Sequence, residues 1–194
     1  MGNVIKINEK EQYNAASCIK IFILVELFNQ INNGTKSRND EIPSLYEHYV
    51  NGSGILGYLS KNIKLPILDV DTLMIISDNV ATNMLIDYLW IENINKIIKD
   101  IGCKDTELYS MFKPTEDEIF SFAPVVNYIA IKSEKYQAVR NDGGIVSTKY
   151  GNYILTILIK DFKDEKYLND EYVYNQGRQI SNIIFNEFIR KSSK

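Results

Sequence analysis

A hydroxyl and an amine lie near the start of the chain at a spacing that could support nucleophilic catalysis. The segment is Ser17-Cys18-Ile19-Lys20, and on a helix two side chains three positions apart share one face. At 100° per residue, Lys20 lies on the apolar side of such a helix, and a polar stripe lies on the opposite side. The apolar side carries Leu24, Leu27 and Ile31, and the polar stripe carries Glu26, Asn29, Gln30 and Asn33.

The position of Lys20 has two interpretations. An ammonium on an apolar face is unfavourable unless it is paired or neutralised, so burial would lower its pKa and make it a base for Ser17. In the structural alternative, Lys20 extends from the first turn into solvent and Ser17 is only the helix N-cap. The four-residue spacing alone does not decide between the two.

Ser77-Asp78-Asn79 is a second polar group, set between two apolar stretches. Three residues of this type before an apolar run usually mark the start of a helix. The functional interpretation instead places the Ser77 hydroxyl and the Asn79 amide at a helix junction that faces a cleft. Both interpretations remain open at this point.

Other chemistries are poorly supported by the composition. The chain has one histidine, His48, and two distant cysteines, Cys18 and Cys103, so we expect no metal site, and nothing in the sequence implies an organic cofactor. A Ser-His-Asp triad would depend on His48 alone, and no GxSxG motif accompanies it. The net charge of −3, with no dense basic patch, argues against nucleic acid as a partner.

We also expect no membrane span, because no stretch approaches the ~18 uninterrupted apolar residues that a span requires. The longest apolar run, Ile19 to Phe28, contains Lys20 and Glu26. No signal peptide is recognisable, so a cytoplasmic location with reduced thiols is expected. The alternative is a trimmed piece of a secreted protein.

The elements that must position these residues follow an α+β order. We predict a first strand, helices through the middle, then an antiparallel meander and a last helix. The strands are expected at Val4–Ile7, Tyr128–Lys132, Gly144–Ser147 and Tyr153–Ile159, with turns at Asn141–Gly143 and Tyr150–Asn152. The helices are expected at Ser17–Asn32, Asp69–Ile76, Val80–Trp90, Ile91–Ile101 and about Tyr167–Arg190. Residues 34–68 are expected to be mostly loop, with a turn at Gly52-Ser53-Gly54.

Taken together, SxxK and SDN are two of the three motifs of class A β-lactamases and penicillin-binding proteins. The chain resembles that superfamily from residue 3 to residue 190, in the right order. The segments that carry the resemblance are Ala15–Leu27, Gly52–Leu56, Leu73–Ile86, Gly102–Leu108 and Val139–Val146. The resemblance implies a β-lactamase-like α+β fold, with a helical lobe at about 15–125 and an α/β lobe at about 1–14 and 126–194. Both lobes are expected to form one domain.

The resemblance also implies roles for individual residues. It makes Ser17 the nucleophile, with Lys20 and Ser77 moving the proton, and it places Asn79 against the substrate. Where the family has Lys-Thr-Gly, this chain has Lys132-Ser133-Glu134, so Lys132, Ser133 and Lys135 are the expected substrate-binding residues. The backbone N–H groups of Ser17 and Lys135 would form the oxyanion hole. The charged segment could also be an ordinary strand end.

Two departures from the family pattern bear on turnover. Glu134 replaces the motif glycine and brings bulk and negative charge to the strand. Only 54 residues separate Ser77 from Lys132, roughly half of the family's spacing. The missing part should include the omega-loop glutamate, which the resemblance implies is the base for deacylation. The local carboxylates Glu107, Glu116, Asp117 and Glu118 lack that glutamate's sequence context.

The sequence therefore supports two functions. The first is a serine hydrolase that is acylated by a β-lactam or an acyl-peptide-like substrate and deacylates slowly. The second is a binding or structural protein that has kept the fold and lost turnover. An intact Ser17, Lys20, Ser77 and Asn79 favour the first, whereas Glu134 and the deletion favour the second.

Overall fold

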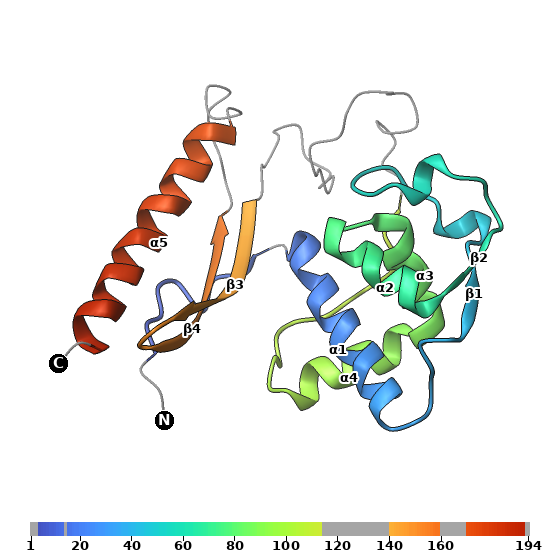
Figure 1. Ribbon diagram of the computed structural model, residues 1–194, viewed down its shortest axis with the longest axis horizontal. Coiled ribbons are helices and arrows are strands. Elements are labelled where there is room, and N and C mark those ends of the chain that lie inside the picture. Colours follow the sequence, from blue (N-terminus) through green and yellow to red (C-terminus); the bar gives the residue numbers. More distant parts are fainter. Residues whose placement is uncertain (1–3, 14, 114–139, 160–169, 193–194) are drawn as a thin grey trace. The chain divides into compact units, whose positions relative to one another are not determined.

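The computed structural model describes residues 4–13, 15–113, 140–159 and 170–192 (Figure 1). Helices and small antiparallel sheets place the chain in the α+β class, as the sequence predicted. The chain divides into two compact units. We call Ser17–Ala130 the helical unit, and Met1–Ala16 with Ile131–Lys194 the hairpin unit. The expectation that the two lobes form one domain stays a prediction.

The helical unit contains α1 (Ile19–Asn32), α2 (Ile67–Leu73), α3 (Asn79–Leu89) and α4 (Ile91–Asp100). Single 3₁₀ turns lie at Ala16–Cys18, Tyr46–His48, Leu56–Tyr58 and Met74–Ile76. All four helices lie close to their predicted positions. A short antiparallel pair, β1 (Glu41–Pro43) with β2 (Lys64–Pro66), lies in the stretch predicted to be loop. Three-residue strands that end in proline give little sequence signal.

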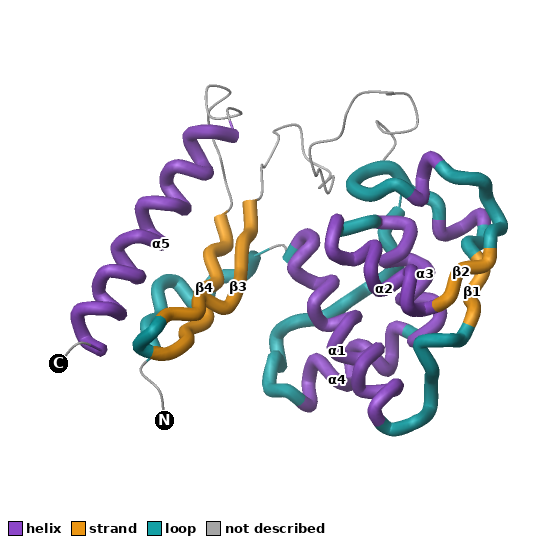
Figure 2. The backbone as a smooth tube through the Cα atoms, in the orientation of Figure 1, coloured by secondary structure: helices purple, strands orange, loops and turns teal. Residues whose placement is uncertain are grey.

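The core of the helical unit forms where α1 packs on α3 and α4 (Figure 2). Its fully buried apolar side chains come from all four helices, which fixes the direction of each helix relative to the others. They include Ile23, Leu27, Ile67, Val70, Leu85, Leu89, Ile94 and Ile98.

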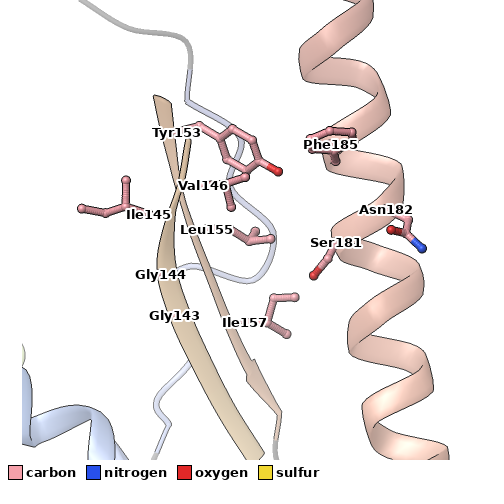
Figure 3. Close-up of a pocket in the computed structure, with 10 residues that line it drawn as sticks. All are labelled: Gly143, Gly144, Ile145, Val146, Tyr153, Leu155, Ile157, Ser181, Asn182 and Phe185. Atoms are coloured by element: carbon pink, nitrogen blue, oxygen red, sulfur yellow. The ribbon is translucent and has the colours of Figure 1, made fainter. Parts of the chain in front are cut away.

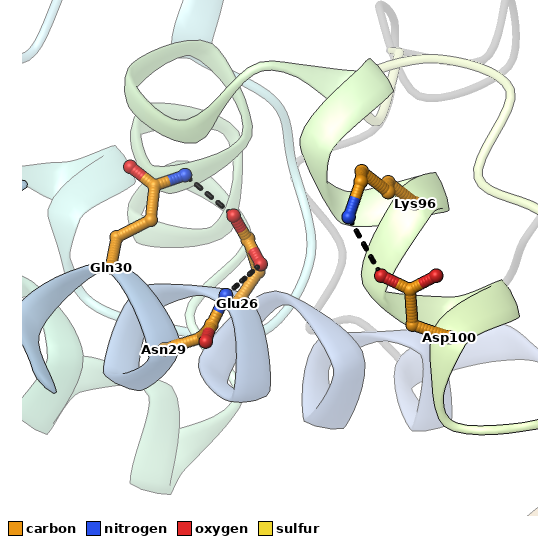
Figure 4. A network of polar contacts seen from close by, with 5 residues as sticks. All are labelled: Glu26, Asn29, Gln30, Lys96 and Asp100. Carbon is orange, nitrogen blue, oxygen red and sulfur yellow. Dashed lines mark hydrogen bonds and ion pairs between the residues drawn. The ribbon is translucent and has the colours of Figure 1, made fainter. Parts of the chain in front are cut away.

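The buried face of α1 is broader than predicted. Lys20 is buried, which favours the first of its two interpretations, but Glu26 and Gln30 are buried as well, although the helical wheel assigned them to the polar stripe. The Glu26 carboxylate accepts hydrogen bonds from Gln30 Nε2 at 2.6 Å and from Asn29 Nδ2 at 3.2 Å (Figure 4). Because α1 packs against two helices, Glu26 is buried, and its carboxylate is hydrogen-bonded by amide side chains of the same helix.

In the hairpin unit, β3 (Arg140–Thr148) pairs with β4 (Gly151–Ile159) and α5 (Asp170–Ser192) lies beside the hairpin. The rings of Tyr153 and Phe188 are 4.8 Å apart between centroids. An open apolar pocket of about 320 Å³ lies between one face of the hairpin and α5, with Leu155 and Ile157 directed into it and Ile145 directed away (Figure 3). None of its lining residues was a predicted site residue.

Two sequence predictions about the hairpin unit are wrong. Val4–Ile7 is not a strand, and its apolar side chains are exposed. Asn141–Gly143 is not a turn, because the two-residue turn at Lys149-Tyr150 sets a register that pairs Asn141 with Leu158 and Gly143 with Thr156. The predicted strand Tyr128–Lys132 lies outside the described residues.

Candidate active site

Ser17 lies in the 3₁₀ turn that leads into α1. Its Oγ accepts a hydrogen bond from Ser77 Oγ at 3.2 Å, so the two motif serines meet although 60 positions separate them. The preceding residue, Ala16, has a φ of 45°, and Ser77 has a φ of 60°. Residues other than glycine are uncommon in this left-handed region, and each costs about 1 kcal/mol or more. Strained backbone is thus found beside one hydroxyl and at the other.

Lys20 is buried, with only 4% of its surface exposed. Its Nζ donates hydrogen bonds to the Ser77 carbonyl oxygen at 2.6 Å, to Ser77 Oγ at 2.8 Å and to Asn79 Oδ1 at 2.6 Å. All three donors of the ammonium are therefore used. The predicted closeness of Ser17 and Lys20 is realised through Ser77, whose hydroxyl bonds to both of them.

The chemistry of these three acceptors matters for proton transfer. The Ser77 carbonyl and Asn79 Oδ1 can only accept, whereas the Ser77 hydroxyl can both accept and donate. A neutral amine has two N–H groups and one lone pair. It can keep both bonds to the acceptors and use its lone pair to accept from the Ser77 hydroxyl, which can in turn accept from Ser17. The site therefore satisfies Lys20 in both of its protonation states.

Burial also sets the protonation equilibrium. Removing the ammonium from water lowers the pKa of Lys20 from 10.5 to about 8, and the Asp78 carboxylate opposes this by raising it. At that pKa, roughly one molecule in ten carries a neutral amine at pH 7. The direction of this shift agrees with the first interpretation of Lys20, in which burial makes it a base for Ser17.

Asp78 holds the Ser77–Asn79 turn in place. It is fully buried and is the N-cap of α3, where Oδ1 accepts from the N–H of Ala81 at 2.9 Å. Its Oδ2 accepts from the N–H groups of Ile55 at 2.7 Å and Leu56 at 2.9 Å. Both carboxylate oxygens are thus occupied by backbone donors, so Asp78 stabilises the turn and is not available as a base.

The Gly52-Ser53-Gly54 turn, predicted from the sequence, packs directly on this segment. A Cβ on Gly54 would lie 2.2 Å from the Asp78 carboxyl carbon, and one on Gly52 would lie 2.2 Å from Asn79 Nδ2. Both glycines have positive φ, at +121° for Gly52 and +115° for Gly54. Only glycine permits this approach.

The turn also orients the Asn79 amide. Asn79 Nδ2 donates to the Asn51 carbonyl at 3.1 Å, and the Asn79 backbone N–H donates to the Ser53 carbonyl at 2.9 Å. With Nδ2 fixed in this way, Oδ1 is turned toward Lys20. Asn79 thus contributes to the environment of Lys20, in addition to the substrate contact predicted for it.

Two residues at this site, Asn83 and Phe112, were given no role in the sequence analysis. Asn83, one turn after Asn79, is fully buried, and its amide makes two hydrogen bonds with the backbone of Phe112. The Phe112 ring centroid lies 5.2 Å from Lys20 Nζ. The available signal was a polar Asn83 between apolar residues of a helix; nothing in the sequence pointed to Phe112.

The remaining predicted site residues are not all described. Lys132, Ser133 and Lys135, together with Glu134 and the carboxylates at 116–118, lie outside the described residues. Glu107 is exposed. His48 is buried, with Nδ1 accepting from the Leu45 N–H and Nε2 3.4 Å from an Asp87 oxygen, and its carbonyl accepts from Asn83 Nδ2.

Neither a metal centre nor a membrane-spanning helix is found in the described part of the chain. Within it, no group of three or more histidine, cysteine, aspartate or glutamate side chains could hold a metal ion. Among its helices, none is both long enough and apolar enough to span a membrane.

Comparison with known proteins relates this geometry to a family. The family described as "Beta-lactamase enzyme family" matches residues 1–128. A structure of PBP-A is similar at 31% sequence identity over 53% of this chain and 40% of that one, with a TM-score of 0.51. The chain therefore spans less than half of that relative.

Two other solved structures match over more of the chain. A β-lactamase from Sphaerobacter thermophilus DSM 20745 is 21% identical over 84% of this chain and 81% of its own, with a TM-score of 0.67. A PBP-A variant in an acyl-enzyme complex with penicillin G is 20% identical over 94% of this chain and 84% of its own, also with a TM-score of 0.67. Both likenesses show the fold. No curated protein matches the sequence.

Proposed function

The chain belongs to the Beta-lactamase enzyme family, and on that premise we propose that it is a serine hydrolase in which a β-lactam or a related acyl substrate acylates Ser17. The observation that carries the proposal is the continuous hydrogen-bond chain from Lys20 Nζ through Ser77 Oγ to Ser17 Oγ. The buried amine of Lys20 at one end of this chain has a lowered pKa, so it can serve as the base for the nucleophile Ser17 at the other end.

Acylation would proceed by proton transfer along this chain of hydrogen bonds. Neutral Lys20 accepts a proton from the Ser77 hydroxyl while Ser77 accepts the proton of Ser17, and the Ser17 oxygen attacks the lactam carbonyl. The ring C–N bond then breaks, and a proton returns from Lys20 through Ser77 to the departing nitrogen. Because that nitrogen stays attached through the rest of the ring, nothing leaves, and the protein gains the whole mass of the β-lactam.

The β-lactam substrate class is supported by a relative. A PBP-A variant with the same fold was captured as an acyl-enzyme with penicillin G. In this chain the substrate carboxylate would be held by Lys132 and Ser133, and the oxyanion would be bound by the backbone N–H groups of Ser17 and Lys135. Lys135 follows Glu134, which replaces the glycine of the family motif, so this part of the proposed site departs from the family pattern.

Deacylation is expected to be slow. Hydrolysis of the ester requires a base that activates water, and a positioned base typically contributes ~10²–10⁴-fold in rate. Among the described residues, the carboxylate that acts on Lys20 is Asp78, and both of its oxygens accept from backbone N–H groups. The side chain that approaches Lys20 from the 103–113 segment is the ring of Phe112.

The test is the time course of hydrolysis of a chromogenic β-lactam, with Ser17→Ala as the control. We expect a burst of about one equivalent followed by a weak steady rate, the kinetic sign of an accumulating acyl-enzyme. A steady kcat above ~10 s⁻¹, the median for enzymes, would show that another carboxylate, such as Glu107 or Glu116, replaces the missing base. No burst and no turnover, with Ser17→Ala identical to wild type, would support the alternative that the chain is a binding or structural protein. Glu134 would then be the first residue to test as a block to substrate entry.

A further inference from the structure

Lys20 has a polar side and an apolar side. Its three N–H groups point to oxygens of Ser77 and Asn79, whereas the Phe112 ring centroid lies 5.2 Å from Nζ. Phe112 comes from the segment after α4, far from α1 in sequence. The half-buried ring thus places apolar surface next to the ammonium.

Phe112 is held there by its backbone. Asn83 Nδ2 donates to the Phe112 carbonyl at 2.9 Å, and the Phe112 N–H donates to Asn83 Oδ1 at 2.8 Å. Asn95 on α4 makes the same pair of bonds with Leu108, both at 2.8 Å. Two asparagine amides thus fasten the 108–112 segment at points four residues apart, which leaves little freedom in where the Phe112 ring lies.

From this arrangement we propose that Phe112 is a positioning residue that excludes water from Lys20 and so holds part of its amine in the neutral, basic form. The proposal rests on the proposed function for its catalytic meaning. Asn83 and Asn79 lie one turn apart on α3, so the same helix supplies both the polar partner of Lys20 and the anchor of its apolar cover.

Two effects of the ring oppose each other. A cation over an aromatic face is stabilised, which favours the ammonium, whereas loss of hydration disfavours it. Burial is the larger influence on the pKa of Lys20, which lies below its ordinary value. The water-excluding effect of the ring is therefore expected to dominate over its attraction for the cation.

The charges around Lys20 do not account for this direction. Asp78 is the carboxylate that acts on it, and that influence raises the pKa. Tyr88 on α3 donates to Asp40, and the other ionisable side chains of α1, α3 and α4 are likewise exposed or engaged with other groups. They are Glu26, Asp87, Glu92, Lys96, Lys99 and Asp100.

The experiment is an NMR titration of Lys20 in the free protein, using ¹³C-labelled lysine, for wild type and three variants. Phe112→Ala admits water and should raise the pKa of Lys20 by about one unit, which corresponds to about a tenfold smaller neutral fraction near pH 7. Phe112→Leu keeps the apolar cover without the aromatic face, so its titration should stay at the wild-type midpoint or below it. Tyr109→Ala removes an exposed aromatic of the same segment and should change nothing.

The acylation rate with benzylpenicillin, followed against pH by intact mass, gives the second readout. The rate should rise with pH as Lys20 loses its proton, and the midpoint should move upward in Phe112→Ala only. A Phe112→Ala titration midpoint equal to wild type, in a protein with a wild-type circular dichroism spectrum, would overturn the proposal. If no variant is acylated but the midpoints shift as described, the proposed function fails and the role of Phe112 stands.

Discussion

The two units differ in how firmly their side chains are packed. In the helical unit the hydrophobic core and the Ser17–Lys20–Ser77 cluster share the same helices, and every side chain described as buried lies in this unit. In the hairpin unit, the described side chains of β3, β4 and α5 are half-buried or exposed. A proton relay requires fixed distances, and the hydrogen-bonded cluster proposed to act as one lies in the densely packed unit.

The largest effect is expected from Lys20→Ala, which tests whether the chemistry depends on the helical unit. Removing the base should slow acylation of Ser17 by at least ~10²-fold, while circular dichroism shows an unchanged fold. Lys96→Ala is the matched control, because Lys96 is an exposed lysine whose partner is Asp100 on the same helix. Acylation of Lys20→Ala at the wild-type rate would mean that Lys20 is not the base.

The packing difference itself can be measured with a pair of isoleucines. Ile23 on α1 is fully buried, whereas Ile154 on β4 is 77% exposed. Ile23→Ala should lower the free energy of unfolding by about 2–5 kcal/mol, because it leaves a cavity in the core. Ile154→Ala should change it by only about 0.5 kcal/mol. Urea denaturation measures both, and equal losses would contradict the comparison.

A smaller effect is expected from glycine substitutions inside the helical unit. Gly54→Ala combines a positive φ with a Cβ placed 2.2 Å from the Asp78 carboxyl carbon, so it should cost about 2 kcal/mol or more and disturb the Ser77 turn. Gly34→Ala also has a positive φ but nothing within 4 Å of its Cβ, and should cost about 1 kcal/mol.

Thermal unfolding of both glycine variants, together with the acylation rate, tests this pair. Only Gly54→Ala should slow acylation. If both variants lose the same stability and keep the wild-type acylation rate, then the close approach of the Gly52–Gly54 turn does not position the site.

The sequence predicted the helical unit better than the hairpin unit for a physical reason. α1 and α3 are specified locally, by apolar periodicity, by Asp78 as an N-cap and by the Asn33-Gly34 stop. The expected strand at Val4–Ile7 needed a distant partner that a local pattern cannot supply. The expected turn at Asn141–Gly143 was wrong because strand register, which is set elsewhere, overrides turn propensity.

The same distinction applies within the site. The helical wheel placed Lys20 on the apolar side of α1, and the family resemblance gave it a shared role with Ser77. The burial of Glu26 and the anchoring of Phe112 by Asn83 depend on which helices pack together, which no short segment encodes. The roles of Lys132, Ser133 and Lys135 stay predictions.

The most direct test is the intact mass of the protein after incubation with benzylpenicillin, with peptide mapping of any adduct. We expect a gain equal to the mass of the whole penicillin, one per chain, located on the peptide that contains Ser17 and lasting minutes or longer. Ser17→Ala should show no gain. A wild-type protein whose mass stays unchanged, with no turnover, would contradict the claim that this cluster is a nucleophilic site.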